Sequence, residues 1–460
     1  MKLNRKFWFM AAFAAVNCAG QALAGVTAEQ AAKLKNTLTP YGAERAGNKD
    51  GSIPTWEGGY KHNPGQYKNG ESREDLYPNE KPTLVINAQN VSQYADKLSE
   101  GVKGLIKKYP NTFSLQVYPT HRTAAAPQWV YDNIAKNATR AKLSADGQKL
   151  EGAYGGIPFP IPSTGIEVMW NHKLQYLGEG YALNVAAYSG GADGKITKAS
   201  NAYSNVINPY YFKDGSLETY KGVSSMWRVW VTGPAHKAGE QFLLHQFTDR
   251  PMQVWQYLVG QRRVRKAPTF CCDTPEEVNS GINYVDEAYG FYGDLDRYDW
   301  KLVGKREMYI PYNGNKLVSK EAEKVGAQKG NHVNPDLVRW EKHRVWVVEA
   351  TVKEGKRHAI PKRTFYVDED TWSVILSDGY DAQGTLWRVG ISVPFVAPEG
   401  PFVYGNGQWS VYDLVAGNYL AGLLTDWSNS SYKWHFKTYA KEATPLAEFT
   451  PDAMAGSGVR

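Results

Sequence analysis

The chain has 460 residues, of which 42% are hydrophobic, so it is long enough to bury a substantial core. Its formal net charge of +7 is small for this length and argues against a nucleic-acid-binding protein, which would carry a strongly basic domain. Aromatic residues make up 13% of the chain, with 30 Tyr and 15 Trp. This enrichment suits an extended β-surface that contacts sugars, lipids or a membrane interface.

The first 24 residues have the pattern of a cleaved export signal. Three cations within the first six residues precede the apolar run FWFMAAFAAV, and an A-x-A motif follows at residues 22–24. The apolar run is too short for a membrane-spanning helix, and no later window approaches the roughly 18 apolar residues that such a helix requires. We therefore expect a soluble, exported protein that begins near Gly25.

Sequence patterns in the first part of the chain, up to residue 174, predict three helices. Residues 27–30, TAEQ, form a capping box that begins a short helix. Residues 92–109 carry one apolar stripe, with most of their lysines off it, and predict a second helix that lies across a sheet until Pro110 ends it. Residues 154–165, YGGIPFPIPSTG, place three prolines among apolar residues and predict an extended wall segment rather than a central strand. Residues 164–174, TGIEVMWNHKL, predict the third helix.

From about Tyr181 onward the pattern is β-rich. The predicted strands cover residues 224–231, 240–247, 252–265, 299–310, 343–354, 363–380 and 384–393. Neither a repeat of fixed period nor a low-complexity linker divides the sequence. We expect one large, mostly antiparallel sheet with a few helices, in which a helical leader at residues 25–112 packs on a β-rich domain at residues 113–460.

Local motifs for catalysis or metal binding are absent from the sequence. The nine histidines form neither an H-x-x-x-H motif nor a cluster with cysteine. The chain also has no G-x-S-x-G motif, and no G-x-G-x-x-G motif follows a strand. We therefore expect no metal, no cofactor and no catalytic residues, although residues far apart in the sequence can still assemble an enzyme site.

The segment 252–265, MQVWQYLVGQRRVR, has an aromatic end and a cationic end. Unless its central glycine marks a bulge, alternation puts Trp255, Tyr257, Arg263 and Arg265 on one face. Such a face suits an amphiphile whose acyl chain lies over the rings and whose anionic head lies near the arginines. The alternative is that the arginines are solvated or paired with acids.

The mature chain contains two cysteines, and these are adjacent: Cys271 and Cys272. In an oxidising compartment the pair is a candidate for a vicinal disulfide, and two free thiols are the alternative. The following Thr274-Pro275 pattern is typical of a helix N-cap with proline at the first helical position. We therefore expect the cysteines at a corner between a strand and a helix.

Several segments, taken in order, resemble a known family. They are GGIPFPIP (155–162), MWNH (169–172), QVWQYLVGQRRVRK (253–266), YGFYGDLDRYDWKLVGKREMYI (289–310), RTFYVDEDTWSVILSDGYDAQGTLWRV (363–389) and FTPDAM (449–454). The chain resembles the periplasmic outer-membrane lipoprotein-sorting-like proteins, in particular the family called domain of unknown function 1329. This family is related in fold to the lipoprotein carriers LolA and LolB. The cysteine pair is atypical for it.

The resemblance implies a mainly β fold with helices (α+β), in which a curved, incomplete antiparallel β-barrel wraps over helices and encloses an apolar cavity. It further implies a non-catalytic periplasmic carrier for an acyl chain or another hydrophobic small molecule: a lipid, a sterol or a terpenoid that moves between the inner and outer membranes. Implied protein partners are an inner-membrane exporter of the resistance–nodulation–division type and an outer-membrane protein. We expect the ligand to contact Trp227, Trp255, Tyr257, Arg263, Arg265 and Trp300.

Two other classes of function remain open at this point. An outer-membrane β-barrel would explain the aromatic content, although lipid-facing strands carry few charges and arginines such as Arg228 and Arg262 interrupt the strands here. A periplasmic enzyme that acts on a glycan or a lipid would need catalytic residues dispersed along the chain.

Overall fold

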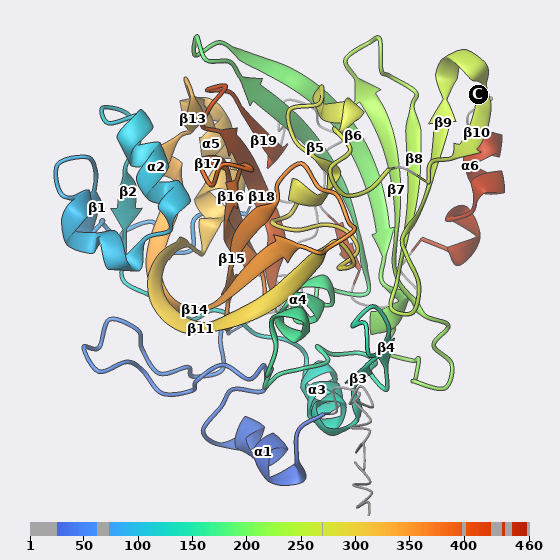
Figure 1. The fold of residues 1–460 in the computed structure, drawn as a ribbon, viewed down its shortest axis with the longest axis horizontal. Coiled ribbons are helices and arrows are strands. Elements are labelled where there is room, and N and C mark those ends of the chain that lie inside the picture. The colour runs from blue at the N-terminus through green and yellow to red at the C-terminus, as the bar shows by residue number, and fades with distance from the viewer. Residues whose placement is uncertain are drawn as a thin grey trace, which may run out of the picture.

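The computed structural model describes residues 25–61, 73–268, 270–397, 402–424, 435–437 and 444–457. The predicted export signal at residues 1–24 lies outside the described residues. The chain is built around a large curved sheet whose two ends do not meet (Figure 1). None of the described helices has both the length and the apolar character needed to cross a membrane.

One sheet of 16 strands forms the body of the fold. From edge to edge, its main path is β1 (Leu84–Ile86), β2 (Leu115–Val117), β14 (Arg339–Val352), β15 (Lys362–Asp368), β16 (Val374–Tyr380), β17 (Leu386–Ala397), β18 (Phe402–Asp413), β19 (Tyr419–Leu424), β5 (Gly180–Gly190), β6 (Ile196–Ile207), β7 (Val223–Gly233), β8 (Gln241–Phe247), β9 (Gln253–Leu258) and β10 (Arg263–Lys266). In addition, β11 (Tyr298–Pro311) pairs with β14, and β20 (His435–Lys437) pairs with β5. The pairings are antiparallel except that of β2 with β14.

The remaining elements are short. Two small hairpins lie apart from the main sheet, β3 (Lys142–Leu143) with β4 (Leu150–Glu151) and β12 (Gln328–Lys329) with β13 (His332–Val333). The α-helices are α1 (Ala28–Ala32), α2 (Glu100–Lys108), α3 (Gln128–Arg140), α4 (Gly165–Lys173), α5 (Lys320–Val325) and α6 (Pro451–Ser457). Helix α4 lies inside the curve of the sheet, α2 covers β16 and β17 from outside, and α6 packs beside β8, β9 and β10 (Figure 1).

The central strands are buried on both faces because two hydrophobic cores flank them. In β14, Val348 and Ala350 point into the core enclosed by the sheet. The alternate residues Val345 and Val347 point into the core beneath α2. A strand that is covered on both sides reads as a nearly continuous apolar run, which explains the sequence VWVV at residues 345–348 of this strand.

The predicted mainly β class and the curved, open sheet are confirmed. The predicted strands at residues 224–231, 240–247 and 299–310 correspond to β7, β8 and β11. The sheet also takes a strand from the predicted leader, because β1 pairs with β2.

Two predicted strands are in fact hairpins. The segment 252–265 turns at a 3₁₀ turn, Val259–Gln261, and Arg262 adopts a left-handed conformation with φ of 49°. The central glycine therefore lies in a full reversal of the chain rather than in a bulge. The segment 363–380 likewise reverses between β15 and β16, where the Asp368 carboxylate accepts hydrogen bonds from the backbone N and Oγ1 of Thr371.

Two predicted helices are also shorter than expected. The amphipathic segment 92–109 begins as a 3₁₀ helix, Val91–Lys97, and becomes α-helical only at Glu100, because Ser99 is the residue that caps it. The buried Asp378 carboxylate accepts hydrogen bonds from the first N–H groups of this helix at 3.0 and 2.9 Å. After Pro275 the chain forms only a 3₁₀ turn, Glu277–Asn279, rather than the expected α-helix.

Candidate functional site

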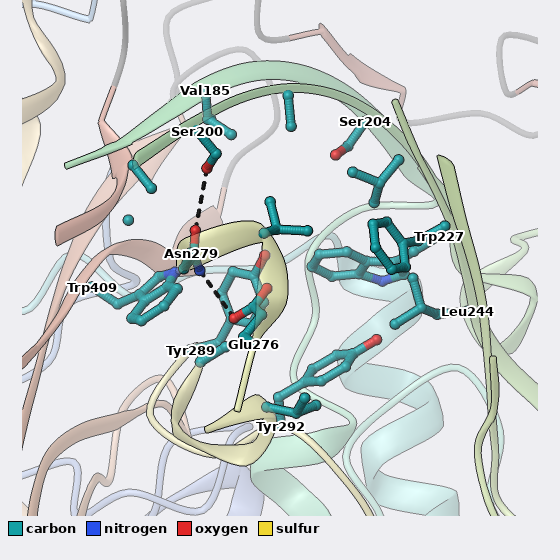
Figure 2. Close-up of a pocket in the computed structure, with 18 of the residues that line it drawn as sticks. Val185, Ser200, Ser204, Trp227, Leu244, Glu276, Asn279, Tyr289, Tyr292 and Trp409 are labelled. Carbon is teal, nitrogen blue, oxygen red and sulfur yellow. Dashed lines mark hydrogen bonds between the residues drawn. The ribbon is translucent and has the colours of Figure 1, made fainter. Parts of the chain in front are cut away.

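The concave face of the sheet carries small and apolar side chains over β5 to β8. Alternate residues of a strand point to the same face, and in β6 these are Ser200, Ala202 and Ser204. Because these side chains are short, a cavity of about 120 Å³ remains between the sheet and the chain segment inside it (Figure 2). The larger apolar side chains of its wall are Val185, Trp227, Val229, Phe242, Leu244 and Trp409.

Residues 270–297 connect β10 to β11 inside the curve of the sheet, and we call them the inner segment (yellow in Figure 1). Two 3₁₀ turns, Glu277–Asn279 and Val285–Glu287, are its only helical elements among the described residues. The inner segment forms the side of the cavity that faces the sheet, through Glu276, Val278, Asn279, Val285, Ala288, Tyr289 and Tyr292. The cavity therefore lies between a regular sheet and an irregular segment.

The backbone of the inner segment is strained next to the cavity. Tyr289 has a φ of 56°, a left-handed conformation that is unusual for a bulky residue and costs on the order of 1–2 kcal/mol. Its ring packs against two walls at once, with centroid distances of 5.2 Å to Trp227 and 5.8 Å to Trp409. These aromatic contacts hold Tyr289 in place. The packing of the rings around the cavity therefore maintains the strained backbone conformation of this residue.

A small polar network reaches the cavity from the inner segment. The Oε2 atom of Glu276 accepts hydrogen bonds from the side-chain amides of Asn279 at 3.0 Å and Asn283 at 2.7 Å. Asn279 in turn accepts a hydrogen bond from the Ser200 hydroxyl of β6 at 3.2 Å, which joins the inner segment to the sheet (Figure 2). Burial raises the pKa of the Glu276 carboxyl, although the two amides partly offset this effect.

Buried ion pairs hold the second half of the inner segment. Arg388 of β17 binds both carboxylate oxygens of Glu287, at 2.8 and 2.7 Å. Asp286 lies 3.0 Å from the guanidinium of Arg363 and 2.9 Å from Nε2 of His358. These charges are desolvated, so each pair depends on its partner to remain buried.

Sequence comparison places the chain in a family. The profile of the family described as "Protein of unknown function (DUF1329)" matches residues 85–455. The chain belongs to the DUF1329 family. It is also 39% identical, over 464 aligned residues, to the uncharacterized protein PA3922 of Pseudomonas aeruginosa, and the alignment covers 96% of both chains. The family predicted from the sequence segments is thus confirmed.

Solved structures with some similarity to this DUF1329 protein share little sequence with it. A DUF1329 family protein from Desulfovibrio piger is 15% identical, with a TM-score of 0.40, and the match covers 63% of this chain and 97% of that one. The LolA superfamily protein NE2245 from Nitrosomonas europaea is 12% identical, with a TM-score of 0.36, and the match covers 64% and 100% of the two chains.

Of the six residues that the sequence predicted to contact a ligand, the structure brings Trp227 to the cavity. Trp255 and Tyr257 point to the opposite side of β9, where they pack with Phe449 and Met454 near α6. Strand parity explains this placement, because Val254 is the β9 residue that faces the enclosed core.

The other three predicted residues also lie away from the cavity of this DUF1329 protein. Arg263 and Arg265 are exposed on the edge strand β10, with side-chain hydrogen bonds to Gln261 and Gln256. Trp300 of β11 packs its ring 5.3 Å from that of Phe291 and donates a hydrogen bond to the Leu295 carbonyl. A ligand in this cavity would therefore not lie over Trp255, and its head would not lie near these arginines, in contrast to what the sequence pattern predicts.

Most of the cavity-lining residues were not singled out in the sequence. Those of β5 and β6 are small residues in segments that had been interpreted only as β-rich. A usable signal was the alternation of small residues at positions 200, 202 and 204, because a strand that faces a large core would normally carry bulky side chains there. The lining residues of the inner segment carry no periodic pattern, so the sequence offers no comparable signal for them.

The two cysteines lie at the start of the inner segment, beside a second and more polar hollow of about 460 Å³. Their Sγ atoms are 2.6 Å apart, and both are free thiols in this structure. Hydrogen bonding from Cys272, together with the nearby Arg297 guanidinium, lowers the pKa of Cys271 to about 7. Whether the pair forms a vicinal disulfide stays a prediction.

One cluster has residue types that could ligate a metal: His343, Asp368 and Asp370, whose potential ligand atoms lie within 4.8 Å of one another. Asp370 already receives two hydrogen bonds from Arg122, at 2.8 and 2.7 Å. His343 lies 3.0 Å from a carboxylate oxygen of Glu341. The cluster is thus part of a buried network of ion pairs. In this network the positive charge next to the Asp370 carboxylate is the guanidinium of Arg122.

Proposed function

We propose that this DUF1329 protein is a non-catalytic periplasmic carrier that binds a hydrophobic or amphiphilic molecule and moves it between the inner and outer membranes. The observation that supports the proposal is the cavity of about 120 Å³ between the inner segment and β5 to β8. Its wall is mostly apolar, and apolar cavities of similar size in proteins stay dry and take up small hydrophobic molecules.

The size of the cavity limits what it holds in the present conformation. A volume of about 120 Å³ is slightly smaller than the roughly 150 Å³ that accommodates a benzene molecule. The cavity thus has room for a ring or for the end of an alkyl chain, and each buried CH₂ group contributes about 0.8 kcal/mol to binding. A longer ligand requires that part of the inner segment moves away from the sheet.

The inner segment has features that suit such a movement in its first half. Its residues up to Asn283 are held by hydrogen bonds, including Ser200 to Asn279 and Lys237 to the carbonyl of Glu277 at 2.7 Å. The buried ion pairs begin only at Asp286 and Glu287. We infer that the first half opens while the second half stays fixed to β15 and β17.

The class of cargo and the partners follow from the family resemblance. Lipids, lipoprotein acyl chains, sterols and terpenoids are the candidate ligands, and a resistance–nodulation–division-type exporter and an outer-membrane protein are the candidate partners. The predicted export signal at residues 1–24 supports a periplasmic location.

Native mass spectrometry of the protein, purified from periplasm without detergent, tests this function. We expect a stoichiometric lipid or terpenoid that organic extraction releases and identifies. A protein that is isolated empty, and that also fails to take up added lipids, would rule out the carrier function.

A further inference from the structure

Two polar groups that line the cavity are buried without a hydrogen-bond partner among the described residues. They are the Oη atom of Tyr292 and the Nε1 atom of Trp409. A buried polar group without a partner is destabilising, so such groups are rare unless a water or a ligand satisfies them. Their presence in an otherwise apolar wall points to an occupant that is not a pure hydrocarbon.

The charges around the cavity restrict the nature of this occupant. None of its lining residues, all of which belong to the described part of the chain, is Lys, Arg or His. An anionic head would therefore be desolvated without a cation beside it, which is strongly unfavourable. Glu276 carries the only carboxyl group among these lining residues, and burial raises the pKa of that carboxyl.

The two hydrogen bonds that Glu276 accepts from asparagine side chains fall on one of its oxygens. Oε2 accepts the N–H groups of Asn279 and Asn283, and neither bond engages Oε1. The Tyr292 hydroxyl and the Trp409 indole N–H are donors that need an acceptor. A hydroxyl group on a ligand is both a donor and an acceptor, so it can hydrogen-bond with the Glu276 carboxyl and with one of these donors.

We propose that the ligand is an apolar molecule whose polar end is an uncharged oxygen group, such as a hydroxyl, and that the Glu276 carboxyl recognises this group by a hydrogen bond. This inference rests on the proposed carrier function and narrows its cargo to neutral alcohols of the lipid, sterol or terpenoid type. Free fatty acids in their anionic form and phospholipid head groups do not match the cavity.

Three probes with a dodecyl or dodecanoyl chain test the proposal: dodecanol, dodecanoate and dodecyltrimethylammonium, whose heads are neutral, anionic and cationic. Each displaces the neutral fluorophore N-phenyl-1-naphthylamine from the purified, delipidated protein at pH 7.5. We expect dodecanol to bind at least about tenfold more tightly than either charged probe, which corresponds to about 1.4 kcal/mol. Equal or tighter binding of a charged probe would overturn the proposal but leave the carrier function intact.

Variants of Glu276 separate recognition by this side chain from general apolar binding. Glu276→Leu should weaken dodecanol binding about tenfold and leave the binding of the charged probes within about twofold. Glu276→Gln keeps an amide donor and should retain most of the preference, and the exposed neighbour Glu277→Leu should retain all of it. If the preference for dodecanol survives in Glu276→Leu, Glu276 is not the recognition group. If the fluorophore and all three probes fail to bind the wild-type protein, the carrier function itself is wrong.

Discussion

The Nε2 atom of His172, on helix α4, lies 3.0 Å from the carbonyl oxygen of Phe291 in the inner segment. The Nδ1 atom of the same ring lies 3.2 Å from the backbone nitrogen of Val374 in β16. Nδ1 also lies 3.4 Å from the side-chain nitrogen of Gln175 and 3.2 Å from the carbonyl oxygen of Trp372. Because two N–H donors face Nδ1, a neutral imidazole fits the site: Nδ1 accepts, while Nε2–H donates to the Phe291 carbonyl. His172 therefore joins α4, the inner segment and the sheet at one point, and this role depends on its being uncharged.

This relationship predicts a loss of stability in acid. Burial lowers the pKa of His172 from 6.5 to about 4. Between these two values the unfolded chain binds a proton on this side chain that the folded chain does not, so the contribution of His172 to the free energy of unfolding falls as the pH decreases from 6.5 towards 4, by about 3 kcal/mol in total. Urea denaturation at a series of pH values measures this slope, which His172→Gln should reduce. His236→Gln, at an exposed histidine, should leave it unchanged. A slope that is identical in all three proteins would contradict the prediction.

The two tryptophans Trp227 and Trp255 should differ in their effect on ligand binding. Trp227 lines the cavity, whereas Trp255 lies on the other side of the sheet near α6. We expect Trp227→Ala to weaken the binding of dodecanol by tenfold or more, because it removes a large part of the apolar wall. Trp255→Ala is the matched control and should bind normally. Fluorophore displacement measures both, and a weaker affinity in Trp255→Ala alone would favour the arrangement first predicted from the sequence.

The ion pair between Arg388 and Glu287 gives a prediction about stability. Arg388→Leu leaves the Glu287 carboxylate buried without a cation and should lower the free energy of unfolding by about 3–5 kcal/mol. The double variant Arg388→Leu/Glu287→Leu removes both charges and should recover a large part of this loss, which denaturant titration will show. If the loss of stability in the double variant equals the sum of the losses in the two single variants, the two side chains do not depend on each other.

Several features of the fold were predictable from the sequence because they rest on local patterns. Thr27 and Gln30 form the expected capping box, and Thr164 begins α4 in the same way. Strands such as β7 and β8 follow from alternating apolar residues between turn signals.

The features that the sequence missed depend on contacts between distant residues. The start of α2 at Glu100 is fixed by Ser99 and by Asp378, which is 278 positions further along the chain. The facing of Trp255 was uncertain because the reversal at Val259–Gln261 and the docking of α6 decide it together. The inner segment was unpredictable for a similar reason, since its irregular backbone is held by side chains from β6, β15 and β17 rather than by its own propensity.

In the proposed periplasmic location, the adjacent cysteines should be oxidised. Their Sγ atoms are 2.6 Å apart, and the pKa of Cys271 is about 7, so a thiolate is available for exchange with a periplasmic disulfide, which would be reduced in the process. We expect intact-mass measurement after alkylation to find no label on the protein taken from periplasm and two labels after reduction. Two labels without reduction would show that the pair remains as free thiols.

We propose that the space between the inner segment and β5 to β8 takes up the apolar part of a ligand. A crystal structure of the protein with dodecanol brominated at the end of its chain would locate the ligand, because anomalous scattering reveals the bromine. We expect a bromine peak on the concave side of the sheet, in the cavity near Trp227 and Tyr289 or where the first half of the inner segment has moved away. A bromine peak only outside the curve of the sheet, with the cavity unchanged, would show that the ligand binds elsewhere.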